Sequence, residues 1–544
     1  MYGDFETTVT EILQATFDFY PLWASGLGLH AYDGVAGRYD LASLDARLRD
    51  LRTAQRALEA VDPNALSPEQ HLDLQVLRAA VEKEQFEIAE LREFERNPIL
   101  YTAFLDTTHY LKRAYAPLDQ RLERLAEYQR QVPGLLETAR RNLVGPCARP
   151  HVQVAMEIFE GMLRYLEHNL PRAAAGASPA VRSRLLEANA QAAAAVRAFL
   201  GFLQEEVLPK ATEAFALGAP LYRRMLWVGE RLDLDLQALR EIGEQELLRL
   251  REAVEEAGRR LAPGRSPAEV VRMLAEEHPS EEELLPLVRA LVEELRAFLE
   301  ERDVVTLPVG DRLHVEPTPP FLRWAFALMD TAGPFEETST DSYYYLTLPE
   351  ADWSPQQKEE WMRRFDPYTL RNTTVHEVYP GHYVHFLHLR RLSSRVRRVF
   401  HAYSFVEGWA HYAEEMLVEQ GYGGEKLRLA QLLDALLRAV RLVVSIGMHT
   451  EGMTVAQAVR RFREDAYLEP LPAYWEAQRG TFDPGYLNYT LGKLMLHKLR
   501  RDYESERGGA FRLREFHDRL LQLGAPPIPV ARQALLRNPG GSLL

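Results

Sequence analysis

The segment His376-Glu377-Val378-Tyr379-Pro380-Gly381-His382 constrains the fold of this chain most, because it contains a helix break between two histidines. In the common H-E-x-x-H zinc motif, the histidines are at i and i+4 and share one helix face. Here the second histidine is at i+6, which on an unbroken helix lies about 9 Å further along the axis and on another face. Proline lacks the N–H that a helix needs, and glycine permits unusual dihedral angles. We therefore predict that the helix is interrupted near residue 380 and that His382 swings back toward His376.

A second segment, Glu407-Gly408-Trp409-Ala410-His411-Tyr412-Ala413-Glu414-Glu415, adds further candidate ligands. Six of the 16 histidines lie between residues 376 and 411, far more than uniform scatter would place there. A hydrolytic zinc site needs three protein ligands, an open position for water and a carboxylate that takes the proton of that water. We expect His376, His382 and Glu407 to bind one zinc ion per chain.

The carboxylate next to the first expected ligand is Glu377, and in H-E-x-x-H sites this glutamate is the general base that activates the metal-bound water. Two further residues, His411 and Glu414, share a helix face with Glu407 at i+4 and i+7. They remain alternatives, either as rival ligands or as groups that orient the ligands.

Composition excludes several classes of protein. The net charge of −14 over 544 residues argues against a nucleic-acid-binding protein, which needs a basic surface. The single cysteine, Cys147, excludes an intramolecular disulfide and a zinc site made of cysteines. The first residues, Met1-Tyr2-Gly3-Asp4-Phe5-Glu6, do not resemble a signal peptide, and the chain lacks a membrane-spanning apolar run. We therefore expect a cytoplasmic protein without membrane contact, and the oligomeric state stays open.

Hydrophobic periodicity indicates a mainly α-helical protein with two lobes. From about residue 40 to 300, apolar residues recur at three and four positions, as in amphipathic helices. Residues 312–316 and 343–348 instead look like strands, and helices resume from Pro355. We expect an N-terminal helical lobe over residues 1–300. The catalytic lobe, residues 301–544, should carry a small sheet near the active-site cleft, and an extended peptide could pair with its edge.

The two central motifs, H-E-x-x-P-G-H and E-G-W-A-x-Y-A-E, resemble those of the DUF885 family of bacterial proteins. Weaker similarities extend over nearly the whole chain, including the pairs Tyr32-Asp33 and Pro484-Gly485 and the run Gly447-Met448-His449. The family usually has glutamine at position 385, leucine at position 411 and aspartate at position 445, where this chain has His385, His411 and Ser445. His385 and His411 are therefore not carried over as ligands.

The DUF885 family is regarded as related to the zinc-dependent H-E-x-x-H peptidases, so the resemblance implies a zincin-like fold. The resemblance also implies that His376, His382 and Glu407 are the metal ligands and that Glu377 is the general base. It further suggests that His449 and Tyr489 stabilise an oxyanion and that Arg479 or Arg500 binds a substrate carboxylate. An arginine that binds a terminal carboxylate would favour a carboxypeptidase or dipeptidase over an endopeptidase.

These features together predict a zinc-dependent peptidase that acts on short peptides, and two alternatives stay open. A di-iron or di-manganese carboxylate protein would need E-x-x-H on two helices, and this chain contains no E-x-x-H. A catalytically inert helical binding protein that retains the family scaffold is the other alternative, and Ser445 in place of the family's aspartate leaves room for it.

Overall fold

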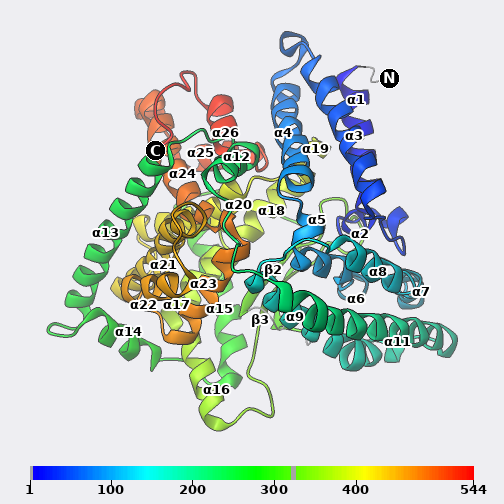
Figure 1. Cartoon of the computed structure of the whole chain (residues 1–544). Helices are drawn as coiled ribbons and strands as arrows, with labels where there is room; N and C mark the ends of the chain where they lie inside the picture. The colour runs from blue at the N-terminus through cyan, green and yellow to red at the C-terminus, as the bar shows by residue number, and fades with distance from the viewer. Residues whose placement is uncertain (1–3, 320–325) are drawn as a thin grey trace. The chain divides into compact units, whose positions relative to one another are not determined.

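The computed structural model describes residues 4–319 and 326–544 (Figure 1). Its Cα atoms fall into two compact units, of which the first contains residues 4–215 and 332–340. The second contains residues 216–319, 326–331 and 341–544. Each unit is mainly helical, as the sequence predicts. Within the described residues, no helix combines the length and apolar composition needed to cross a membrane.

The α-helices of the first unit are α1 (Phe5–Phe19), α2 (Pro21–Gly26), α3 (Leu41–Glu59), α4 (Pro68–Gln85), α5 (Glu93–Arg96), α6 (His109–Lys112), α7 (Leu118–Gln129), α8 (Val132–Asn142), α9 (Arg149–Arg164), α10 (Leu170–Ala173) and α11 (Pro179–Phe202). The second unit begins with α12 (Ala219–Glu230), α13 (Leu236–Leu261), α14 (Pro267–Ala275) and α15 (Glu281–Arg302). After the strands follow α16 (Pro355–Met362), α17 (Pro367–Glu377), α18 (His382–Arg390), α19 (Arg395–Val399), α20 (Tyr403–Glu419), α21 (Glu425–Thr450), α22 (Val455–Asp465), α23 (Pro470–Phe482), α24 (Asn488–Arg507), α25 (Leu513–Gln522) and α26 (Ile528–Leu535).

The predicted strands form a small sheet in the second unit. Strands β1 (Leu313–Pro317), β2 (Ala327–Asp330) and β3 (Ser342–Leu346) have the order β1-β3-β2, with β1 parallel and β2 antiparallel to β3. Sequence patterns predict β1 and β3, whereas β2 spans four half-buried residues and is too short to show an alternating pattern. The sheet shares a hydrophobic cluster with α15, α17 and α18, in which Tyr344 of β3 is completely buried. The sheet therefore supports the helices that carry His376 and His382.

Helices α12–α15, which the sequence analysis places in the N-terminal lobe, belong to the second unit. The reason is close packing of α13 on α21. A Cβ atom added to Gly243 of α13 would lie 2.3 Å from a methyl carbon of Leu442 in α21, so the two helices approach as closely as a glycine allows. Leu236 and Leu239 of α13 are buried in one cluster with Leu442 and other residues of α20, α21 and α24. This contact is long-range and leaves no local sequence signal.

Two glycines bring α20 and α24 into backbone contact. A Cβ atom on Gly492 of α24 would lie 2.0 Å from the carbonyl oxygen of Ser404, and one on Gly408 of α20 would lie 2.6 Å from Cα of Gly492. Since a larger residue at either position would force the helices apart, this contact sets the distance between Glu407 on α20 and Tyr489 on α24.

Residues 332–340 belong to the first unit, although the strands on either side of them belong to the second. The backbone N–H of Phe335 donates to the carbonyl of Leu27 (2.9 Å), and Nε2 of His30 lies 2.9 Å from Oε2 of Glu336. Burial lowers the pKa of His30, but hydrogen bonds with Asp33 and Glu336 outweigh it and raise the pKa to about 9. Burial raises the pKa of Glu336, but the bond with His30 and two backbone N–H groups lower it to about 2. The segment is thus held by an ion pair and by main-chain hydrogen bonds.

Candidate metal centre

The chain reverses between the two histidines. Helix α17 ends at Glu377, α18 begins at His382, and the backbone N–H of Gly381 donates to the carbonyl of Val375 (3.0 Å). A Cβ atom on Gly381 would lie only 1.8 Å from the carbonyl oxygen of His376, so this position accommodates glycine alone. The indole N–H of Trp409, on α20, donates to the carbonyl of Pro380 (3.0 Å). These contacts hold the last turn of α17 next to the first turn of α18.

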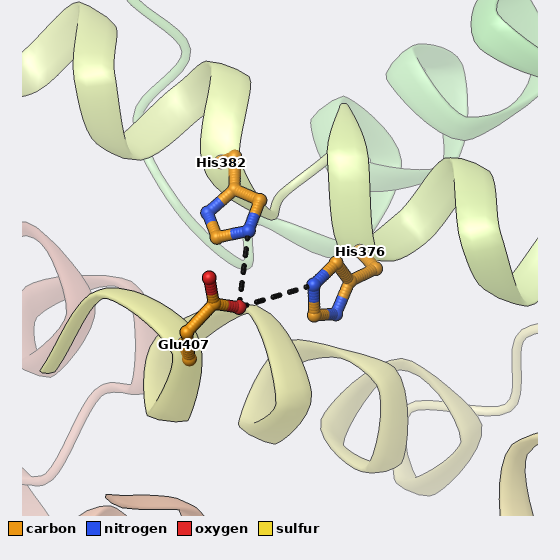
Figure 2. Close-up of side chains that lie close together, drawn as sticks. All are labelled: His376, His382 and Glu407. Atoms are coloured by element: carbon orange, nitrogen blue, oxygen red, sulfur yellow. Dashed lines mark ion pairs between the residues drawn. The ribbon is translucent and has the colours of Figure 1, made fainter. Parts of the chain in front are cut away.

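This reversal brings the three predicted ligands together (Figure 2). Nε2 of His376 and Nε2 of His382 lie 3.5 and 3.4 Å from Oε2 of Glu407, and the imidazole ring centroids are 4.8 Å apart. The three potential ligand atoms all lie within 4.8 Å of one another. Among the described residues, no other group of histidine, cysteine, aspartate and glutamate has this arrangement. We call His376, His382 and Glu407 the triad.

The triad fits a divalent metal ion. Two ligands at 2.0–2.1 Å from a tetrahedral zinc ion are about 3.4 Å apart, which is close to the spacing of Glu407 from each histidine. Oε2 of Glu407 is buried and has no hydrogen-bond partner within the described residues. A buried carboxylate oxygen without a partner is costly, and a cation in contact with it would remove that cost. Two imidazole nitrogens and one carboxylate oxygen are also a donor set that catalytic zinc sites use.

Behind His376 lies a buried network of charges. Oε1 of Glu414 accepts a hydrogen bond from Nδ1 of His376 (2.7 Å), and its Oε2 accepts from Nη1 of Arg438 and Nδ2 of Asn372, both at 3.0 Å. Glu414 is almost completely buried, yet the charge of Arg438 and its histidine partners hold its pKa well below the usual range. Because Nδ1 donates to Glu414, Nε2 of His376 faces the triad, as metal ligation requires. The geometry therefore makes Glu414 an orienting group.

Electrostatics in the triad favour a cation. Burial lowers the pKa of His376, but the nearby carboxylate of Glu407 and the hydrogen bond with Glu414 outweigh it and raise the pKa to about 9. Burial raises the pKa of Glu407, but the positive charges of His382 and His376 hold it well below its usual range. A proton on His376 thus takes the place that a metal ion could fill, and metal binding at neutral pH would release it.

The predicted base follows His376 directly in the sequence, and the predicted oxyanion donor lies next to the triad. Glu377 is half-buried, and its charge contributes to the raised pKa of Tyr344, which is caused mainly by burial. Within the described residues, the Glu377 carboxylate has no hydrogen-bond partner, so it is available to a substrate or water. The ring of Tyr489 stacks on His376 at a centroid distance of 6.4 Å. Burial raises the pKa of Tyr489 and the charge of Glu407 raises it further, so the hydroxyl stays protonated as a donor.

Three arginines surround the ring of Tyr489. The guanidinium carbons of Arg438, Arg441 and Arg479 lie 5.7, 5.1 and 5.6 Å from its centroid. Arg441 is committed to a bidentate pair with Glu476, with both distances at 2.7 Å. Arg479 is the most exposed of the three, at 32% of its side chain, against 12% for Arg438 and 10% for Arg441.

A second tyrosine joins this arrangement. Nη2 of Arg479 donates to the hydroxyl of Tyr403 (3.0 Å) and reaches that of Tyr489 (3.5 Å). Tyr403 is at i−4 from Glu407 on α20 and was not identified by the sequence analysis. The sequence signal that could have identified Tyr403 is its position one helical turn before Glu407, a predicted ligand. Glu230 caps this end of α20 by accepting hydrogen bonds from the backbone N–H groups of Tyr403 and Ser404.

The structure does not bring the other two predicted site residues, His449 and Arg500, to the triad. Nε2 of His449 bonds to the carbonyl of Gly480 (2.7 Å), and the ring is 1% exposed in the core. His449 lies eight residues beyond Arg441, about 12 Å further along α21. Nη1 of Arg500 bonds to Glu419 (2.7 Å) and Tyr412 (3.3 Å). It lies eleven residues beyond Tyr489, about 16 Å further along α24.

The other histidines and the serine that the sequence analysis singles out also lie outside the triad. His411 is completely buried and burial lowers its pKa to about 3, while Nδ1 lies 3.5 Å from Glu414. His385 is completely buried and contacts the carbonyl of Gly524 (3.3 Å). Ser445, which replaces the family's aspartate, donates to the carbonyl of Pro484 (2.8 Å) and also bonds to the hydroxyl of Tyr222.

The fold and the triad define a mainly helical protein with a candidate His-His-Glu metal centre at a helix reversal. The chain belongs to the DUF885 family of bacterial proteins of unknown function, whose sequence model matches residues 21–535. The predicted family resemblance is therefore confirmed over nearly the whole chain. No curated protein matches the sequence.

Two solved structures have the same fold. One is a candidate lipoprotein of unknown function from Shewanella oneidensis, with 22% identity, a TM-score of 0.82 and coverage of 98% of this chain and 99% of that chain. The other is a candidate lipoprotein from Colwellia psychrerythraea, with 18% identity, a TM-score of 0.82 and coverage of 98% of both chains. A carboxypeptidase from Pyrococcus furiosus aligns with 14% identity over 97% of this chain and 95% of its own, but its TM-score of 0.43 does not show a shared fold. The cytoplasmic location stays a prediction.

Proposed function

We propose that this protein is a metal-dependent peptidase that removes residues from the carboxyl end of short peptides. The observation that carries the proposal is the convergence of Nε2 of His376 and Nε2 of His382 on one oxygen of Glu407, with an unpartnered carboxylate, Glu377, next in sequence to the first ligand. A structural network would pair its carboxylates. The combination instead has the parts of a zincin-type hydrolytic site.

The roles of the residues follow from their positions. The triad would hold a zinc ion, which would act as a Lewis acid and lower the pKa of a nucleophilic water molecule. Glu377 accepts the proton of the attacking water and returns it to the leaving amine. The hydroxyl of Tyr489 donates a hydrogen bond to the oxyanion that develops on the scissile carbonyl. Glu414 and Arg438 keep the ring of His376 in the orientation that leaves Nε2 available.

Arg479 supports action at a peptide terminus. A guanidinium has five N–H donors. Arg479 already pairs with Asp483 through Nε (3.0 Å) and Nη2 (2.9 Å), and its Nη2 also bonds to the two tyrosine hydroxyls, so Nη1 is the nitrogen that makes no bond within the described residues. Its Nη1 can therefore bind an additional carboxylate. Because Arg479 contacts the hydroxyl of Tyr489, a terminal carboxylate bound there would place the last peptide bond near the triad. Arg500, the alternative predicted from sequence, is engaged elsewhere.

The test uses the full-length purified chain, loaded with zinc and freed of excess metal. Wild-type protein should bind one zinc ion and release the last residue from N-acetylated tripeptides. Glu377→Gln should retain zinc but lower kcat by roughly 10²- to 10⁴-fold. His382→Ala should lose both zinc and activity, whereas His168→Ala, an exposed histidine of the first unit, serves as the matched control.

Chelator-insensitive hydrolysis, or full activity in Glu377→Gln, would refute the peptidase proposal. Absence of zinc binding at micromolar concentration would instead favour an inert binding protein that retains the scaffold. Equal hydrolysis of peptides with free and amidated carboxyl ends would show that Arg479 does not bind a terminal carboxylate and would indicate an endopeptidase.

A further inference from the structure

Helix α23 exposes a large apolar face. Leu471 is 64% exposed, Tyr474 is 41% exposed and Trp475 is 44% exposed. The rings of Tyr474 and Trp475 contact each other edge-on at 5.6 Å. Monomeric proteins expose single apolar residues routinely, but a contiguous group with two aromatic rings points to a binding surface. We call Leu471, Tyr474 and Trp475 the α23 patch.

The α23 patch adjoins the candidate metal centre through Arg479. Residues at i and i+4 of a helix are neighbours, so Trp475 lies one turn before Arg479, about 6 Å away and about 40° around the axis. Leu471 continues the same stripe one turn earlier. Arg479 in turn contacts Tyr489, whose ring stacks on His376. One helix thus presents a guanidinium and, beside it, an aromatic surface.

A buried acceptor lies next to the patch as well. Gln478 is 7% exposed, and its amide N–H donates to the hydroxyl of Tyr474 (2.7 Å). The amide oxygen of Gln478 is buried and has no hydrogen-bond partner within the described residues. Buried acceptors are normally satisfied, so this oxygen is an unsatisfied polar atom next to Tyr474.

We propose that the α23 patch binds the side chain of the substrate's C-terminal residue and selects peptides that end in an aromatic or large aliphatic residue. The inference rests on the proposed function, in which Arg479 binds the terminal carboxylate. In an amino acid, the carboxylate and the end of a large side chain are about 6 Å apart, because successive chain atoms are about 1.5 Å apart. Arg479 and Trp475 lie on neighbouring turns whose Cα positions are about 6 Å apart, so both side chains are within reach of one bound residue. A small or charged side chain would leave the rings of the patch in water.

The experiment compares N-acetyl-Ala-Ala-Phe with N-acetyl-Ala-Ala-Gly as substrates of the zinc-loaded protein. Wild type should show a kcat/KM ratio of at least roughly tenfold in favour of phenylalanine. Trp475→Ala should lower that ratio about tenfold, chiefly through KM, and Trp475→Phe should restore most of it. Trp227→Ala is the matched control, since Trp227 is a 41% exposed tryptophan on α12. Leu471→Ser provides a second variant at the most exposed position of the patch.

An unchanged ratio in Trp475→Ala and Leu471→Ser, or an equal decrease in Trp227→Ala, would overturn the inference. Thermal unfolding of each variant identifies any that does not fold. Calorimetric binding of the two peptides separates this inference from the proposed function. If neither peptide is hydrolysed but the phenylalanine peptide binds more tightly and loses that advantage in Trp475→Ala, the peptidase proposal fails and the patch assignment holds. If both peptides are hydrolysed at the same kcat/KM, the peptidase proposal holds and the patch assignment fails.

Discussion

The close approach at Gly381 leads to a quantitative prediction for Gly381→Ala. The new Cβ atom would lie 1.8 Å from the carbonyl oxygen of His376, 2.4 Å from its carbonyl carbon and 2.5 Å from the carbonyl oxygen of Val375. All three are backbone atoms at the end of α17, so no side-chain rotation relieves the overlap. Ordinary contact begins near 3.4 Å, and the turn must therefore move by roughly 1.5 Å.

A displacement of this size is several times the roughly 0.2 Å that metal–ligand distances tolerate. It carries His382 away from the other two members of the triad, because His382 follows the turn directly. We expect the zinc affinity to fall at least about 100-fold, which corresponds to about 2.7 kcal/mol. The overlap should also lower the free energy of unfolding by about 1–3 kcal/mol.

The assay is a competition titration of zinc against a chromophoric chelator, followed by urea unfolding of the same samples. Gly134→Ala is the matched control, since a Cβ atom there meets nothing within 4 Å and the residue lies inside α8. It should leave zinc binding unchanged and stabilise α8 slightly. Wild-type zinc affinity in a folded Gly381→Ala protein would show that the close approach does not position His382, and the argument for the reversal would fail.

Three further changes have expected outcomes. Glu414→Ala removes the acceptor of Nδ1 of the first ligand and should lower zinc affinity roughly 10- to 100-fold in the same titration. Gly492→Ala places a Cβ atom 2.0 Å from a carbonyl oxygen of α20 and should lower the free energy of unfolding by about 1–3 kcal/mol in urea. His30 stabilises the folded state fully below pH 6.5 and loses this contribution as the pH rises through about 9. In His30→Gln, the urea midpoint should therefore fall less than in wild type over that pH range. Glu336, with its pKa lowered to about 2, contributes fully above pH 4.5 and loses that contribution only as the pH falls through about 2.

Controls for these changes come from the same chain. Glu360→Ala alters an exposed carboxylate of α16 and should not change zinc affinity. His168→Gln alters an exposed histidine of the first unit and is the matched control for the urea-unfolding measurements. A Glu414→Ala protein with unchanged zinc affinity would contradict the orienting role, and a pH profile of His30→Gln that matches wild type would contradict the ion pair.

Local chemistry was enough to predict that His376, His382 and Glu407 come together. Proline followed by glycine between two histidines requires a helix end, and the structure has one at Glu377. The glycine is needed for a reason that spacing alone does not reveal, namely the 1.8 Å approach to the carbonyl of His376. The predicted β1 and β3 are confirmed because Tyr343-Tyr344-Tyr345 is a pattern with strong β propensity.

Local sequence patterns do not predict long-range contacts. His449 and Tyr489 are equally plausible cleft residues in sequence, but only Tyr489 stacks on His376, because α24 meets α20 at a glycine pair. Tyr403 and Arg441 join the site from helices whose register depends on packing. The choice between His411 and Glu414 also depended on rotation within α20: the carboxylate reaches His376, while the imidazole is buried among core residues.

The docking of residues 332–340 into the first unit has a practical consequence for dissecting this protein. A gene divided after codon 215 would encode an N-terminal product without its own Glu336, leaving His30 without that carboxylate and the carbonyl of Leu27 without the N–H of Phe335. The C-terminal product would contain residues 332–340, which belong to the first unit, between strands β2 and β3 of its sheet. We therefore expect neither half to fold as it does in the intact chain, and substitutions to be more informative than truncations.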